Sequence, residues 1–425
     1  MRKIATVCLA ALAKHVLKNG LRVLLSEDHT SPTISYYSWF DVGSGHEKKG
    51  MTGIAHLFEH MMFQGTQKFG KKQYDKLIAS HGGNNNAFTS NDYTAYYVNI
   101  ESSELELLIK LEADRLTGLN ITKENLDSER EVVKEERRLR TDNDPMGKMY
   151  EELFLLAFPE HPYGWPVIGF MQDVTGLSVD QCKDFYQTYY SPNNLTIALV
   201  GDFSVSKAIK LLEKYYSSAP SQVIPPREMP KISLEPSEKR KMIHDVTQSE
   251  MLMTVFQVPK VGTPESYAFS VLEKILSSGN TSRLYKRLIY EEEVATQVGA
   301  GYYGLKDAGL FLFYLIMKPG SSLKKGEKML IEEIKDIIDK KVSDRELIKA
   351  KNNLSTSFAF GLKSRNTVAR ELGYNQLIYG DYRHFFSDLK KYESITAQDI
   401  QKAAEVFFVP NRKTTIVLLP QGNES

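Results

Sequence analysis

The feature that most constrains the fold is an internal duplication on either side of a proline-rich break. Residues 177–199 align with residues 395–417 at an offset of 218, and both patterns predict a helix followed by a strand. Residues 128–134 align with 343–349 at an offset of 215. Five prolines between Pro220 and Pro236 interrupt the periodicity between the copies. With 425 residues, 42% of them hydrophobic, the chain can bury two such cores.

The first half carries a helix that is typical of a metal site. In the run Ala-His-Leu-Phe-Glu-His-Met-Met-Phe of residues 55–63, His56, Glu59 and His60 share a helical arc of roughly 100° among apolar neighbours. A divalent cation satisfies two imidazoles four residues apart, which are otherwise costly to bury. The order His-x-x-Glu-His is the inverzincin signature, with the glutamate as general base on a metal-bound water. The alternative is a pair of core or surface histidines.

A third protein ligand is expected from the helix-forming run 122–137. Val132, Val133 and Leu139 are its predicted apolar face. Glu129 and Glu136 share a face, but seven residues place them about 10 Å apart along the axis, so one straight helix cannot offer both to a single ion. One of them therefore ligates and the other supports it. Without the histidine motif, so charged a helix would be a solvated face.

These residues resemble the pitrilysin/insulinase superfamily of zinc metallopeptidases, which includes insulin-degrading enzyme and the mitochondrial processing peptidase. Within it, the chain is similar to the bacterial processing-peptidase-like subunit that carries the zinc motif. The family's third ligand lies 76 residues beyond the second histidine, which is Glu136 here, and a further glutamate precedes it by seven residues, at Glu129. The resemblance implies one Zn²⁺ per chain held by His56, His60 and Glu136, with Glu59 as base and Glu129 in support.

The resemblance also implies an α+β fold of two homologous α/β-sandwich domains, whose mostly antiparallel sheets carry helices on one face. At an offset of 214, Ser270 and Lys274 replace the two histidines, and at 215 Lys351 replaces Glu136. We therefore expect a zinc-binding peptidase domain at 14–219, a proline-rich linker at 220–237, and a degenerate copy without metal ligands at 238–425.

Strand signals surround the metal helix. Asn19-Gly20 predicts a hairpin within residues 15–25, and residues 34–42 predict a strand that a glycine-containing turn ends. Residues 82–89 predict a loop that leads into a strand pair. In the family, the equivalent of Asn86 and Ala87 lies on an edge strand that binds the substrate backbone. The alternative is a hairpin tip rich in asparagine and glycine.

The activity that the resemblance implies is zinc-dependent hydrolysis of peptide bonds in extended peptides or unfolded segments. Catalytic relatives carry an arginine, followed seven residues later by a tyrosine, in the second half. These positions fall on Ile289 and Thr296, and neither side chain can stabilise an oxyanion as that pair does. We therefore expect a heterodimer with a paralogous subunit that supplies the Arg/Tyr pair. The alternatives are a homodimer, a loss of activity, and substitution by the nearby side chains Arg283, Tyr285, Arg287 and Tyr290.

A second functional class is a non-catalytic metal-binding scaffold subunit of a larger complex. Zinc content, measured together with cleavage of a quenched peptide, separates this class from a peptidase. His161 does not favour either class, because it lies in a loop dense in proline and glycine and has no partner at i+4.

Composition narrows partners and location. The chain has 54 basic and 53 acidic side chains and no long basic run, so nucleic acid is not an expected partner. No stretch reaches eighteen apolar residues, so no transmembrane segment is expected, and two cysteines, Cys8 and Cys182, exclude a disulfide framework. Residues 1–13 are typical of a short signal peptide, which predicts a periplasmic or secreted protein. The alternative is a buried or frayed N-terminal segment in a cytoplasmic protein.

Overall fold

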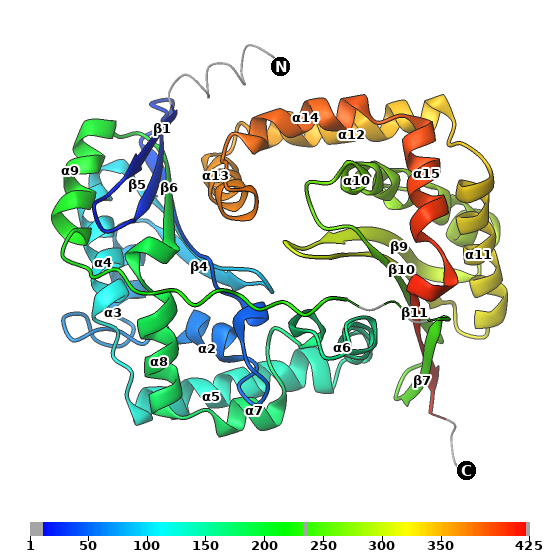
Figure 1. Cartoon of the computed structure of the whole chain (residues 1–425), viewed down its shortest axis with the longest axis horizontal. Helices are drawn as coiled ribbons and strands as arrows, with labels where there is room; N and C mark the ends of the chain where they lie inside the picture. The colour runs from blue at the N-terminus through cyan, green and yellow to red at the C-terminus, as the bar shows by residue number, and fades with distance from the viewer. Residues whose placement is uncertain (1–11, 233, 235, 422–425) are drawn as a thin grey trace. The chain divides into compact units, whose positions relative to one another are not determined.

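The computed structural model describes residues 12–232, 234 and 236–421, which form two compact units (Figure 1). Among these residues, unit 1 contains 12–137, 165–228 and 358–387, and unit 2 contains the rest. The sequence predicts a division along the chain at the linker, whereas the units exchange segments: 138–164 packs in unit 2 and 358–387 in unit 1. The described linker residues contain no helix or strand between Tyr216 and Lys239. Most of the proposed signal peptide lies outside the described residues.

Unit 1 is built on a six-stranded sheet of order β1-β2-β6-β3-β5-β4. The β2–β6 pair is parallel and the other pairs are antiparallel. The predicted hairpin is present, since β1 pairs with β2 across Asn19-Gly20. The predicted loop at 82–89 is wrong in part, because only residues 82 and 83 lie outside a strand and residues 84–89 form β4. The strands are β1 (Leu12–Val16), β2 (Arg22–Glu27), β3 (Thr33–Phe40), β4 (Asn84–Thr89), β5 (Thr94–Glu101) and β6 (Leu195–Gly201).

One face of this sheet packs against the main helical layer. Alternate residues of β3, such as Ile34, Tyr36 and Phe40, point into the core that this layer shares with the sheet. The helices of the unit that precede the linker are α2 (Ile54–Met61), α3 (Gln73–Ser80), α4 (Leu105–Thr117), α5 (Lys123–Arg137), α7 (Met171–Gly176), α8 (Val179–Tyr189) and α9 (Val205–Tyr216).

Unit 2 is built on a five-stranded sheet of order β7-β11-β8-β10-β9, in which only the β7–β11 pair is parallel. Its strands are β7 (Lys239–Asp245), β8 (Met251–Val258), β9 (Ala295–Gly304), β10 (Gly309–Met317) and β11 (Lys413–Pro420). The remaining helices of the chain are α6 (Pro145–Ala157), α10 (Pro264–Ser277), α11 (Leu323–Asp339), α12 (Asp344–Gly361), α13 (Arg365–Tyr379), α14 (His384–Ser394) and α15 (Ala397–Phe407). The two sheets and their helices confirm the predicted α+β class.

The duplication predicted from the sequence is present in the structure. At the offset of 218, α8 and β6 correspond to α15 and β11. Even the capping boxes agree, since Ser178 with Gln181 caps α8 and Thr396 with Asp399 caps α15. At the smaller offsets, α5 corresponds to α12 and α2 to α10.

The second face of each sheet is covered as well, by one helix from the exchanged segments. α13 packs on the face of the first sheet that carries Tyr37 and Trp39, and α6 packs on the second sheet beside Met253 and Ile416. Gly373 allows the first contact, because a Cβ there would lie 2.2 Å from the Trp39 ring. The sequence prediction places helices on one face only and contains no sign of this exchange.

Candidate metal centre

Gly53 is the N-cap residue of the metal helix α2, and its φ of +88° places it in the left-handed region. A Cβ at this residue would lie 2.6 Å from the carbonyl oxygen of Ile168, so both conformation and space require glycine. The carboxylate of Glu47 accepts hydrogen bonds from the N–H groups of Gly53 and Ala55, each at 2.9 Å. Glu47 thereby satisfies the first turn at the positive end of the helix dipole. Burial raises the pKa of Glu47 well above its ordinary value.

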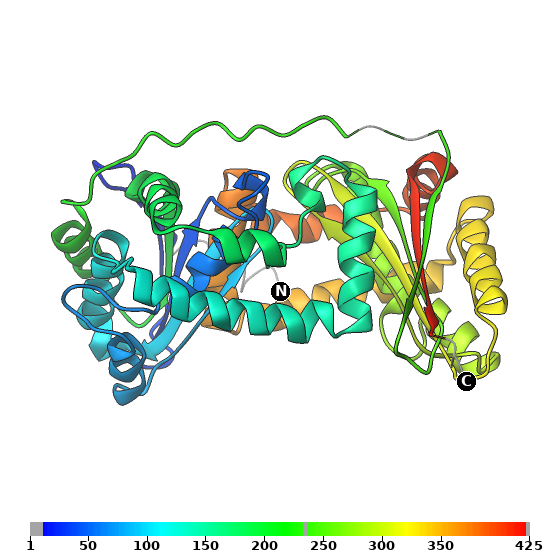
Figure 2. The same cartoon turned by 90° about the horizontal axis from the view of Figure 1, so that it is seen from below.

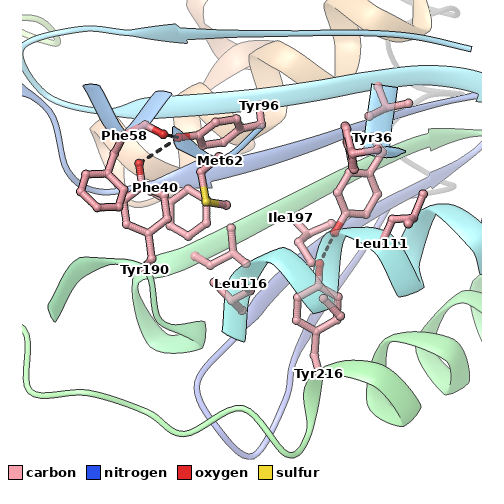
Figure 3. Packing of buried hydrophobic residues seen from close by; sticks show 14 of the residues in the cluster. Tyr36, Phe40, Phe58, Met62, Tyr96, Leu111, Leu116, Tyr190, Ile197 and Tyr216 are labelled. Atoms are coloured by element: carbon pink, nitrogen blue, oxygen red, sulfur yellow. Dashed lines mark hydrogen bonds between the residues drawn. The ribbon is translucent and has the colours of Figure 1, made fainter. Parts of the chain in front are cut away.

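The apolar side of α2 is anchored in the core of unit 1 (Figure 3). The hydroxyl of Tyr96, on β5, donates to the carbonyl of Phe58 at 3.1 Å and lies 2.9 Å from the hydroxyl of Tyr190. The Phe58 ring lies 5.4 Å from that of Tyr190. These contacts leave the polar arc of α2 as the side that faces α5, which runs alongside it in both views (Figures 1 and 2).

Helix α5 supplies the carboxylates. The buried residues on its inner side are Leu126, Glu129, Val133 and Arg137. The predicted apolar face is therefore wrong in part, because Val132 is 48% exposed and Leu139 is 72% exposed. The predicted Val133 is buried and anchors the helix together with Leu126, and Glu129 is buried on the same inner side.

The described residues contain one group of three side chains that could hold a metal ion: His56, His60 and Glu136, whose ligand atoms all lie within 4.8 Å of one another. Glu136 Oε2 lies 3.7 Å from His56 Nε2 and 3.3 Å from His60 Nε2. Ligands bound tetrahedrally at about 2.0–2.1 Å lie roughly 3.4 Å apart, so this donor set fits a zinc ion.

The electrostatics favour a cation at this point. Burial by itself lowers the pKa of His60, but the neighbouring carboxylates of Glu129 and Glu136 outweigh it and raise the pKa to about 9. Excess negative charge therefore surrounds the imidazole, and a divalent cation neutralises such charge where a proton otherwise would.

Glu129 lies behind His60 and does not join the three converging atoms. Its Oε2 is 3.6 Å from His60 Nδ1, which is long for a hydrogen bond but close enough to orient the ring. Gln64 Nε2 donates to Glu129 Oε1 at 2.6 Å and holds the carboxylate in place. The supporting role of Glu129 stays a prediction, and Gln64, which contacts it, is not among the residues predicted from the sequence.

Glu59 lies on the same arc of α2 as the histidines, and β4 orients it. The hydroxyl of Thr89, the last residue of β4, donates to Glu59 Oε2 at 2.7 Å. Thr89 is not among the site residues predicted from the sequence. A signal was available, because Thr89 lies two residues beyond Ala87 and so on the same side of the strand.

Among the residues that the structure describes, strand β4 is an edge strand that pairs only with β5. Asn86 and Ala87 lie in its middle, and the register places Ala87 opposite Tyr96, which belongs to the core beneath α2. One strand therefore carries both predicted substrate-binding positions and the hydroxyl that holds Glu59. An added peptide strand would pair along this free edge.

The second half presents no equivalent chemistry at the positions derived from the resemblance. Ile289 packs against the core of unit 2, and Thr296 donates to the carbonyl of Ile316 at 3.3 Å. The nearby arginines are bound to carboxylates: Arg283 to Glu346 and Asp336, and Arg287 to Glu332 and Glu333.

His161 is separate from this group. It lies beside a short helical turn of unit 2, is 3% exposed, and its Nδ1 accepts a hydrogen bond from the backbone N–H of Tyr163. The prediction of a loop histidine is consistent with this position.

The chain is similar to known peptidases of one family. Residues 22–166 match the family model described as Insulinase (Peptidase family M16), and residues 176–354 match the model described as Peptidase M16 inactive domain. The zinc protease PqqE of Helicobacter pylori is 29% identical over 96% of this chain and 94% of that protein. An Arabidopsis thaliana protein named "Probable mitochondrial-processing peptidase subunit beta" is 24% identical over 92% of this chain and 75% of the length of that protein.

The fold has a solved counterpart. The crystal structure of a protease from Helicobacter pylori superimposes with a TM-score of 0.93 and 29% identity, over 96% of this chain and 99% of that one. Within the residues described here, no helix is both long and apolar enough to cross a membrane.

Proposed function

The chain belongs to the insulinase family, peptidase family M16, and from this premise we propose that it is the metal-bearing subunit of a zinc-dependent endopeptidase. The observation that carries the proposal is the convergence of His56, His60 and Glu136, with ligand atoms within 4.8 Å of one another, next to a glutamate that a hydrogen bond holds in place. The substrate class is extended peptides or unfolded segments, since a free strand edge lies beside this group.

The residues of the chain divide the work. His56, His60 and Glu136 would hold the zinc ion, and Glu129 with Gln64 would orient His60. When bound, zinc supplies a polarising charge and lowers the pKa of a coordinated water. Glu59 takes a proton from the attacking water and returns it to the leaving amine.

Strand β4 positions both reactants. Its free edge aligns the peptide backbone at Asn86 and Ala87, and its last residue, Thr89, fixes the Glu59 carboxylate. The same strand thereby positions both the base Glu59 and the substrate backbone, which favours a productive geometry for the reaction.

The proposal includes a partner subunit. Ile289 and Thr296 offer no guanidinium or phenol, and the ion pairs of Arg283 and Arg287 hold both arginines against α11 and α12. Part of the oxyanion stabilisation, about 3 kcal/mol, would therefore come from another chain. The name of the plant relative, a peptidase subunit, is in keeping with this proposal. A paralogous heterodimer is the arrangement we favour over a homodimer.

The experiment is reconstitution. The purified, zinc-loaded chain is assayed on a quenched peptide alone, and then with a paralogous subunit whose arginine and tyrosine are intact or substituted. We expect activity only with the intact partner. Full activity of the lone chain, or indifference to the partner's arginine and tyrosine, would refute the partner requirement. About one bound zinc without cleavage under any condition would favour the scaffold function.

A further inference from the structure

A hollow of about 310 Å³ lies in unit 1 on the face of the first sheet that α13 covers. Four aromatic rings and one ion pair line it: Trp39, Phe88, Tyr93, Arg370, Glu371 and Tyr374. Trp39 is 1% exposed and forms the floor, whereas the side chains of Arg370 and Glu371 are 51% and 24% exposed. The hollow therefore opens to solvent at the level of α13.

The hollow has a simple origin in the strand register. Trp39, Ala95 and Phe88 are direct neighbours across β3, β5 and β4, so their side chains share one face. The methyl group of Ala95 fills little of the space between two large rings. Helix α13 packs over β3 and β6, so it leaves this end of the sheet uncovered.

The same register connects the hollow to the free edge of β4. Successive side chains of a strand point to opposite faces. Thr89 contacts Glu59 on the α2 face, and Ala87 packs against the core on that face. Phe88 contacts Trp39 on the α13 face, with ring centroids 5.6 Å apart. A peptide strand added to β4 would likewise direct alternate side chains to each face, and those on the α13 face would pass beside Phe88.

We propose that this hollow is a specificity site that receives an aromatic side chain of the peptide paired with β4. The proposal rests on the proposed function and deepens it, because it names a feature of the substrate. The rings that line the hollow already meet edge to face, at 78° for Trp39 and Phe88 and 88° for Phe88 and Tyr93. A further ring can join in the same way.

Charge argues for a neutral aromatic group over a cation. Glu371 is the one acidic residue of the lining, and Arg370 Nη2 already donates to its Oε1 at 2.9 Å. The pair contributes no net charge to the hollow, so a lysine or arginine side chain would find no unbalanced carboxylate there.

The first test measures specificity in the reconstituted enzyme. A quenched peptide with a single phenylalanine, moved one position at a time through an alanine background, is compared with the all-alanine peptide. We expect one position at which phenylalanine raises kcat/KM by about tenfold or more. Tyr374→Ala should abolish this preference, and Tyr379→Ala, a half-buried tyrosine of the same helix outside the hollow, should keep it. An unchanged preference in Tyr374→Ala would overturn the proposal.

The second test does not depend on activity. The chain has two tryptophans, Trp39 and Trp165, so Trp165→Phe leaves the indole at the floor of the hollow as the only one. In a Glu59→Gln background, the phenylalanine peptide should change the Trp39 emission saturably, and the alanine peptide should not. A change in Trp39 emission, together with no hydrolysis by the parent enzyme, would support the aromatic site and refute the peptidase function. Hydrolysis by the parent enzyme without a change in Trp39 emission would refute the aromatic site and leave the peptidase function supported.

In both tests, thermal unfolding of each variant checks that the variant is folded. If Tyr374→Ala does not fold, Phe88→Leu tests the same hollow through a half-exposed residue of β4. It should lower the ratio of kcat/KM for the phenylalanine peptide to kcat/KM for the alanine peptide, and an unchanged ratio would overturn the proposal.

Discussion

At the residue scale, Glu59 separates metal binding from turnover. Glu59→Gln should keep the zinc and lower the rate by about 10²–10⁴-fold, because an amide cannot accept the proton of the attacking water. His56→Ala and Glu136→Ala should lose the metal itself, since each removes one of three converging ligands. Zinc stoichiometry and peptidase rate are measured on the same samples. A Glu59→Gln rate within about tenfold of the parent would exclude Glu59 as the base.

Thr89 tests whether the orientation of that base matters. Thr89→Val keeps the shape of the side chain and removes the hydroxyl that donates to Glu59 at 2.7 Å. A hydrogen bond to a charged group contributes about 1.5–3 kcal/mol, so kcat should fall by roughly ten- to a hundredfold with zinc content unchanged. Thr89→Ser is the matched control and should restore most of the rate. Equal rates for the valine and serine variants would contradict a positioning role.

At the scale of the element, the entry of the chain into α2 carries a cost that can be measured. Gly50 and Gly53 both have a positive φ, but only Gly53 has neighbours within contact distance of a Cβ. Gly50→Ala should therefore cost about 1 kcal/mol from conformation alone. Gly53→Ala should cost clearly more and weaken zinc retention, because the helix must move away from Ile168. Urea unfolding and zinc release report the two effects, and equal costs for the two variants would contradict the steric argument.

In unit 2, Arg283 ties the segment after α10 to α12 through Glu346, with Nη2 2.9 Å from Oε2. This guanidinium is the main cause that lowers the pKa of Glu346 to about 2. Because the folded pKa lies below the unfolded one, near 4.3, the pair stabilises above that pH and its contribution disappears as the pH falls toward 2. After allowance for solvent screening, Glu346→Gln should lose about 1–2 kcal/mol at pH 7.

Urea midpoints of the parent and Glu346→Gln, taken from pH 7 down to pH 2, check this expectation. The difference between them should shrink in the acidic range. A difference that stays constant across the range would show that the ion pair does not provide the stabilisation.

At the scale of the whole molecule, location depends on residues 1–13. If they are a signal peptide, the mature chain begins near Lys14 and is exported. The mature chain then contains one cysteine, Cys182, and an oxidising compartment tolerates a single cysteine. The intact mass of the protein isolated from its native host measures the trimmed N-terminus directly. A full-length chain in the cytosolic fraction would contradict export.

The amino-acid sequence by itself determined what depends on neighbours along the chain. Two histidines and a glutamate within five positions share an arc because a helix turns 100° per residue, and Asn19-Gly20 forms a hairpin because both residues suit its turn. The duplicated helix and strand order also follows, since equal patterns form equal elements.

Only the tertiary structure decided what depends on residues far apart. The inner face of α5 contains the predicted Val133 together with Leu126, whereas the predicted Val132 and Leu139 are exposed, because the packing partner selects which of several apolar positions is buried. The hydrogen bond of Thr89 to Glu59 and the hollow that α13 helps to line join residues 30 and up to about 335 positions apart. The exchange of segments between the units has the same basis: a sheet has two faces to cover, and local patterns do not encode which distant helix covers the second.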